Sequence, residues 1–274
     1  MKRSMRVLAF GVLATMAVAA PASALTVTTT SDANVLTNTI LGPGITIVGT
    51  PTYSANTTGG SGTFSGGLAS GIGINSGIIL TTGTAAGAVG PNNQDGFTGS
   101  GTFSQLDFDF TSAGGSVFFN YVFASEEYNE FTNSQFNDSF TLKVDGTNIA
   151  LIPSTTTPVQ INTVNGGNPF GTGASNPQYF VNNDLNDGGP FHNIQYDGFT
   201  KVFTATTTVG AGTHHMEFFI TDLGDSSLDS AVFVQAGSFS ENETPVPLPA
   251  TLLLMGAGLV AMGGYARTAR RASK

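Results

Sequence analysis

Short apolar runs with the two-residue period of a β-strand recur along the middle of the chain. The run Leu106-Asp107-Phe108-Asp109-Phe110 alternates strictly, which predicts a strand with one face in water. Residues 117–124 are almost entirely apolar, which predicts a central strand covered on both faces. Further strands are predicted at residues 45–53, 78–82, 140–144, 149–152, 201–209, 216–221 and 231–239.

The segments between these runs have the composition of turns and loops. Asp145-Gly146 separates two apolar runs and predicts a hairpin with a type I′ turn. Residues 55–69, 85–101 and 163–189 are rich in Gly, Ser, Thr and Asn, so we expect them to be exposed loops. No helical periodicity stands out between the chain ends. The predicted fold is therefore all-β, a single and jelly-roll-like β-sandwich over residues 25–240.

The first 24 residues have the three parts of a secretory signal peptide. Lys2, Arg3 and Arg6 are followed by an apolar stretch and then by Ala22-Ser23-Ala24, the small-residue pattern that signal peptidase cleaves. Cleavage after Ala24 would start the mature chain at Leu25. The sequence therefore predicts export.

The last 29 residues form a second tripartite segment, after a short expected linker at residues 241–245. A Pro-containing motif, Val246-Pro247-Leu248-Pro249, precedes an apolar stretch at residues 251–265. Fifteen helical residues reach about 22 Å, which is shorter than a hydrocarbon core of roughly 30 Å. The basic residues that follow should remain cytoplasmic and leave the preceding chain outside; they are Arg267, Arg270, Arg271 and Lys274.

This C-terminal segment resembles the PEP-CTERM sorting signal of Gram-negative bacteria. Leu248 occupies the position that is usually Glu in that signal. The resemblance implies recognition by exosortase, a membrane protease-transferase, and a transient inner-membrane form before release to the cell surface or extracellular matrix. An ordinary C-terminal anchor helix is the alternative.

The exported segment is strongly acidic. Only Lys143 and Lys201 oppose its eighteen Asp and Glu residues, which gives a formal charge of −16. Nucleic-acid binding is disfavoured because it requires cations that neutralise phosphates. The chain has no Cys, which excludes disulfides and thiolate metal sites. Divalent cations are the partners that this charge favours.

Acidic residues gather next to three predicted strands. Glu126 and Glu127 follow the central strand, Asp138 precedes the next one, and Asp222, Asp225 and Asp229 lie between two late strands. Calcium takes six to eight oxygen ligands from carboxylates, amides and carbonyls. These six residues are therefore the candidate ligands of a calcium ion, and solvated surface carboxylates are the alternative.

Signatures of enzymes are largely missing from the sequence. It contains no Gly-x-Ser-x-Gly, His-Glu-x-x-His or phosphate-loop motif. His214 and His215 are adjacent on a predicted strand, so their side chains should face opposite ways and cannot share a metal. His192 stands alone in a Gly-rich loop, and we expect no catalytic residue among the three.

Three ordered motifs resemble the choice-of-anchor L domain across residues 35–239. The first runs from Gly73-Ile74-Asn75-Ser76-Gly77 to Pro91-Asn92, and the second from Val122 through Ser125-Glu126-Glu127-Tyr128 to Phe136-Asn137-Asp138. The third joins Ile220-Thr221-Asp222 to Asp229-Ser230-Ala231. The family name refers to alternative anchoring signals, so the resemblance implies surface display and carries no activity.

Three functions remain open. The first is a structural or adhesive role at the bacterial surface or in a biofilm matrix. The second is a carbohydrate-binding module for extracellular polysaccharide, with Tyr128, Phe131 and Tyr179 as its aromatics. The third is a glycoside hydrolase that pairs Glu126 or Glu127 with Asp138 or Asp225.

Overall fold

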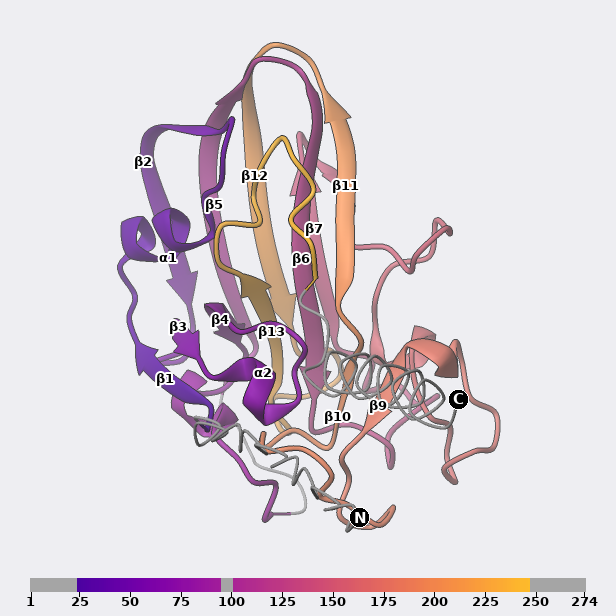
Figure 1. Cartoon of the computed structure of the whole chain (residues 1–274). Coiled ribbons are helices and arrows are strands. Elements are labelled where there is room, and N and C mark those ends of the chain that lie inside the picture. The colour runs from indigo at the N-terminus through magenta and orange to yellow at the C-terminus, as the bar shows by residue number, and fades with distance from the viewer. Residues whose placement is uncertain (1–23, 95–100, 247–274) are drawn as a thin grey trace, which may run out of the picture.

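Two antiparallel sheets packed face to face form the exported part of the chain (Figure 1). The computed structural model describes residues 24–94 and 101–246. The larger sheet contains, in spatial order, β1 (Thr26–Thr29), β3 (Ser61–Ser65), β4 (Ser76–Thr81), β13 (Ser230–Gln235), β6 (Gly115–Ser125), β10 (Gly198–Thr200) and β9 (Phe180–Asn182), with β11 (Phe203–Val209) also paired to β6. The smaller sheet contains β2 (Thr46–Ala55), β5 (Phe103–Ser112), β12 (Gly212–Thr221), β7 (Ser139–Val144) and β8 (Thr147–Asn148). The predicted all-β sandwich is confirmed.

The main core fills the space between the two sheets. Along β6, Phe119, Tyr121 and Phe123 point into this core, while Val122 and Ala124 point to the other face of the sheet. That outer face carries a second core, which is covered by the segments around Ile72, Ala85 and Tyr196. The strand β6 is therefore buried on both faces, as its apolar sequence predicts. The alternation in β5 is confirmed as well, because Leu106, Phe108 and Phe110 are buried and Asp107 and Asp109 are not.

The turn after β7 also agrees with the sequence. Val144 pairs with Thr147, so Asp145 and Gly146 are the two residues of the loop. Both have positive φ, 49° for Asp145 and 80° for Gly146, which is the requirement of a type I′ turn. The predicted strand at 149–152 is wrong, because only the two-residue β8 follows this turn.

A helix that the sequence analysis did not expect closes one edge of the sandwich. The helix α1 (Ala33–Ile40) begins at Asp32, whose side chain accepts hydrogen bonds from the backbone N–H groups of Asn34 and Val35. It contacts β2 in one sheet and β4 in the other, and its residues Leu36 and Ile40 are fully buried in the main core.

All three expected loops contain ordered structure, because residues 163–189 also include η3 (Pro177–Tyr179) and the paired strand β9. Residues 55–69 were predicted to be exposed, yet β3 and most of α2 (Gly67–Ser70) lie within them, and β3 pairs with both β1 and β4. In residues 85–101, the 3-10 turn η1 (Ala85–Ala88) contributes Ala85 and Ala88 to the second core. Two further 3-10 turns, η2 (Ile161–Thr163) and η3 (Pro177–Tyr179), interrupt the long connection from β8 to β9.

The segment at 241–245, expected to be a linker, packs on the sandwich. Ser112 Oγ donates to Glu241 Oε1 at 2.6 Å, and Asn120 Nδ2 donates to the carbonyl oxygen of Thr244 at 2.8 Å. At the other end, Leu25 is only 2% exposed in the second core. The folded unit therefore extends from Leu25 to at least Thr244.

Candidate functional site

Several acidic residues lie at the end of the sandwich near β9 and β10, which is the lower end in Figure 1. In the larger sheet Ser125, the last residue of β6, pairs with Ser230, the first residue of β13. In the smaller sheet Thr221, the last residue of β12, pairs with Ser139, the first residue of β7. The residues flanking these four strand ends are Glu126, Glu127, Asp138, Asp222 and Asp229. Strand pairing thus explains why carboxylates that are distant in sequence lie together.

A chain of hydrogen bonds joins the two sheets at this end. Ser230 Oγ donates to Asp138 Oδ2 at 2.7 Å and lies 2.8 Å from Ser125 Oγ. The backbone N–H of Glu127 donates to the same Ser125 hydroxyl at 2.9 Å, and that of Leu223 donates to Asp138 Oδ1 at 2.8 Å. Asp138 therefore holds the end of β6, the start of β13 and the residue after Asp222 in one place.

Asp229 has a different environment from the other carboxylates. Its Oδ1 accepts from Thr81 Oγ1, from Thr82 Oγ1 at 3.0 Å and from the backbone N–H of Gly83 at 2.6 Å. Its Oδ2 accepts from the Tyr196 hydroxyl at 3.0 Å. Burial raises the pKa of Asp229 to about 6, and these donors act in the opposite direction. We interpret Asp229 as a structural carboxylate that fixes the turn after β4.

Glu126 and Glu127 lie in the bend after β6 and have different neighbours. Glu126 forms a side-chain hydrogen bond with Asp197, a residue whose pKa is raised first by burial and also by the nearby charge of Asp184. Glu127 instead faces the group formed by Asp138, Asp225 and Asp222. Burial, followed by the charge of Asp138, raises the pKa of Glu127 to about 9.

Asp138 and Asp222 share this acidic environment. The pKa of Asp138 and the pKa of Asp222 are both raised to about 7, and burial is the largest cause in each case. The backbone N–H of Asp225 donates to the Asp222 carboxylate. Asp225 itself is exposed, and its Oδ1 caps the backbone N–H of Ser227 at 2.9 Å.

Two buried oxygens in this group lack a hydrogen bond within the described residues. They are Oε2 of Glu127, whose side chain is 1% exposed, and Oδ1 of Asp222, which is 6% exposed. No three His, Asp or Glu side chains in residues 24–94 and 101–246 are gathered tightly enough to hold a metal by themselves. The six candidate ligands therefore divide into three subgroups: Glu127, Asp138, Asp222 and Asp225 lie together, Asp229 is held by Thr, Gly and Tyr donors, and Glu126 faces Asp197.

A second polar cluster, which the sequence analysis missed, adjoins Glu126. Asn92 Nδ2 donates to the Asp197 carboxylate and, at 3.3 Å, to the carbonyl oxygen of Asn183. Asp184 accepts from the backbone N–H of Asn129 at 3.3 Å. Asp184 lies in the expected loop 163–189 and Asp197 follows it, and their clustering depends on how this part of the chain folds back onto β6.

The histidines have structural partners. His214 Nδ1 lies 2.7 Å from Asp145 Oδ2, whereas His215 Nδ1 lies 2.8 Å from Asp109 Oδ1. The two rings therefore contact different carboxylates, as their alternation on a strand predicts. His192 is half-buried against the ring of Phe199, and this burial lowers its pKa.

The aromatic residues proposed for sugar binding are mostly unavailable. Tyr128 is completely buried and packs against Phe180, and Tyr179 packs against Phe203. Phe131 is 36% exposed, and Phe170, which was not proposed, is 49% exposed. Phe170 lines a cavity of about 230 Å³ together with amide and carboxylate residues; these are Asn129, Glu130, Asn168, Asp184, Asn186 and Asp187, with Pro169 beside them.

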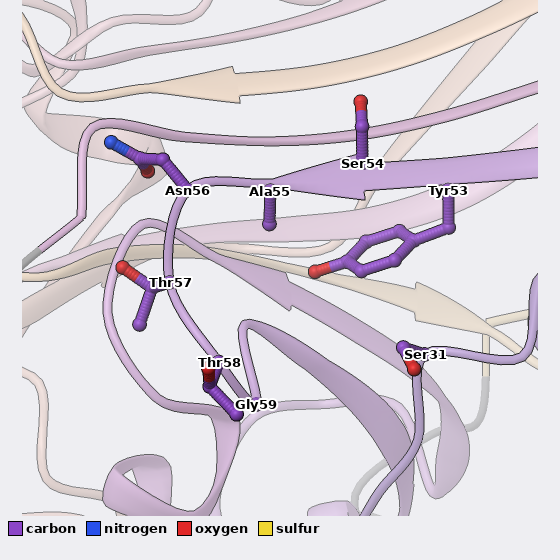
Figure 2. Close-up of a pocket in the computed structure, with 8 residues that line it drawn as sticks. All are labelled: Ser31, Tyr53, Ser54, Ala55, Asn56, Thr57, Thr58 and Gly59. Carbon is purple, nitrogen blue, oxygen red and sulfur yellow. The ribbon is translucent and has the colours of Figure 1, made fainter.

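Another cavity, of about 370 Å³, lies where β2 ends (Figure 2). Tyr53 and Ala55 point to the side on which Thr57 and Thr58 lie, whereas Ser54 points away. The Tyr53 hydroxyl lies 3.1 Å from Ser104 Oγ. The cavity is lined by hydroxyl, amide and small side chains, with no carboxylate or imidazole among them.

The two terminal signals lie almost entirely outside the described residues. This applies to Ala22 and to the residues that follow Val246, including Pro247, Leu248, Pro249 and the basic tail with Arg267, Arg270 and Arg271. Within the described part of the chain, the search for a helix with the length and apolarity to cross a membrane found none.

Comparison with protein families identifies the domain. The choice-of-anchor L domain matches residues 25–240, so the chain belongs to this family. No curated protein matches the sequence. Family membership characterises the chain as a surface-associated, exported protein.

Proposed function

We propose that this protein has a structural or adhesive role at the surface of a Gram-negative cell or in the matrix around it. The supporting observation is that the packed part of the described chain reaches close to both expected processing sites. Leu25, the first residue after the expected signal-peptidase cut, is already buried, and the packed segment continues to Thr244, just before Val246. Cleavage by signal peptidase and exosortase would therefore leave the sandwich intact.

The charge of the domain fits this role. Lys143 pairs with Glu217 at 2.6 Å, which leaves Lys201 as the other lysine of the exported segment. A sandwich with so few cations repels nucleic acid and anionic lipid, and it stays soluble at high local concentration. Such a surface suits a displayed spacer or matrix component.

Protease treatment of intact cells that express the full chain tests surface display. We expect added protease to remove the sandwich domain from intact cells while a cytoplasmic marker survives. A deletion strain should lose matrix cohesion or adhesion and regain it on complementation. Protection of the domain until the cells are lysed would contradict the proposal.

Carbohydrate binding is the second candidate, and the cavity beside Phe170 favours it. An exposed aromatic ring next to amide and carboxylate groups is an arrangement that can hold a sugar by its apolar face and its hydroxyls. A glycan array probed with the wild-type protein and with Phe170→Ala separates the two candidates. A spacer binds no glycan specifically, whereas a carbohydrate-binding module shows signals that the substitution abolishes.

A further inference from the structure

We infer that one calcium ion binds between the two sheets at the end of the sandwich, with Glu127 and Asp222 as its central carboxylate ligands. Glu127 follows β6 of the larger sheet, and Asp222 follows β12 of the smaller sheet. The inference goes beyond the proposed surface role and names a ligand and the side chains that hold it.

The first argument is the state of the two carboxylates. Glu127 Oε2 and Asp222 Oδ1 are buried and have no hydrogen-bond partner among the described residues. An unsatisfied buried polar atom costs about 1–3 kcal/mol, and more when the group is charged. Protonation lowers this cost but leaves a hydroxyl that needs an acceptor. A cation bound by both carboxylates would satisfy both oxygens at once.

The second argument is the direction in which the two side chains face. Asp138, Asp225 and Asp222 are, in that order, the strongest charged neighbours of Glu127. Asp138 is held in place by Leu223 and Ser230, so it cannot move away from Glu127 without breaking those hydrogen bonds. Like charges fixed at a short distance repel unless a proton or a cation intervenes.

The third argument concerns the choice of ion. The charged side chains that act on Glu127 and Asp222 are carboxylates, whereas zinc prefers nitrogen and sulfur ligands. Calcium accepts irregular sets of carboxylate, carbonyl and water oxygens, whereas magnesium demands a near-ideal octahedron. Two carboxylates completed by backbone oxygens and water therefore suit calcium, even though no three acidic side chains converge by themselves.

The structure also separates ligands from neighbours. Asp229 is already surrounded by four donors, and the Glu126 side chain is hydrogen-bonded to Asp197. Neither is part of the inferred site. Asp225 is exposed in the loop after Asp222, next to the inferred ligands.

Thermal melting of the full chain in mild detergent tests the inference. A ligand present at a hundredfold excess over its Kd should raise Tm by about 5 to 10 °C for a domain of this size. We expect this shift for the wild type in millimolar calcium relative to chelator, and a smaller one in equimolar magnesium. Glu127→Gln and Asp222→Asn should each abolish most of the calcium shift. Each should also melt higher than the wild type in chelator, because the repulsion is relieved.

Glu243→Gln is the matched control, since Glu243 is exposed and far from the strand ends that carry the site. It removes one charge and should keep the full calcium shift. Coincident wild-type curves in calcium and chelator would overturn the inference. A shift that persists in both Glu127→Gln and Asp222→Asn would also overturn it, because the ion would then lie elsewhere. Either failure leaves the surface role untouched, since protease accessibility on intact cells measures that role separately.

Discussion

Ser230 donates a 2.7 Å hydrogen bond to Asp138 and so links the start of β13 in one sheet to the start of β7 in the other. Both residues are fully buried. The contact fixes a carboxylate beside Glu127 and Asp222, which come from two further strand ends. Four segments that are distant in sequence thereby form one acidic group, and the inferred calcium site depends on this arrangement.

The main core should depend strongly on Phe239. Its ring stacks on Phe119 with centroids 4.3 Å apart and meets Phe110 edge-on at 4.8 Å. Phe239→Ala should lower the free energy of unfolding by about 3–5 kcal/mol, because it removes a fully buried aromatic side chain and leaves a cavity. Chemical denaturation measures this loss. Phe191→Ala is the control, since Phe191 is 59% exposed and its removal should change stability by less than about 0.5 kcal/mol.

Asp229 should behave as a structural residue and not as a calcium ligand. Asp229→Ala leaves Thr81, Thr82, Gly83 and Tyr196 without their acceptor. We expect a loss of stability on the order of 3 kcal/mol in denaturant titrations. The calcium-dependent increase in Tm should remain. If Asp229→Ala loses that increase while remaining folded, Asp229 belongs to the cation site and our assignment is wrong.

The contact between His214 and Asp145 should add a small pH dependence to stability. The hydrogen bond that His214 donates to Asp145 raises the pKa of His214 above 6.5. The hydrogen bonds that Asp145 accepts from the His215 N–H and from His214 lower the pKa of Asp145 below 3.8. The pair therefore contributes its full stabilisation between pH 3.8 and pH 6.5, which are the ordinary pKa values of Asp and His. Its contribution is lost as pH rises through the raised pKa of His214, or falls through the lowered pKa of Asp145. Because Asp145 is half-exposed, the effect should stay below about 1 kcal/mol.

Asp145→Asn isolates this contribution, since Asn also suits a type I′ turn. The difference in unfolding free energy between wild type and variant should shrink as pH rises above 6.5. Taking the difference cancels the contributions that the other nearby groups make to the pH dependence. These groups are the Gly210 carbonyl and the Phe110 ring next to His214, and Asp107 and Asp109 next to His215. A difference that is constant from pH 5 to pH 9 would show that the pair carries no charge interaction.

The sequence predicted those elements whose signal is local. The all-apolar β6 and the alternating β5 have patterns that hardly fit another structure, and Asp145-Gly146 specifies its turn by itself. The strand β3 was missed because Ser61–Ser65 contains one large apolar residue, Phe64, and is held by partners on both sides. The helix α1 was missed because it has only eight residues, several of them Asn and Thr, and is stabilised by burying Leu36 and Ile40.

The candidate site was predictable in composition but not in grouping. All six acidic residues were recognised next to predicted strands. Which of them face one another depends on the pairing of β6 with β13 and of β12 with β7, which no local pattern encodes. The separation of Glu126 from Glu127 arises in the bend after β6, and the presence of Asp197 beside Glu126 required the folded connection.

Intact mass spectrometry of the protein recovered from the outside of intact cells tests export, processing and surface display most directly. We predict a mass that corresponds to a chain beginning at Leu25 and ending between Pro247 and Thr251, the range that contains the expected exosortase cut. A species that begins at Met1, or one that retains the segment from Arg267 to Lys274, would contradict the proposed processing. Recovery of the protein only from lysed cells would contradict surface display itself.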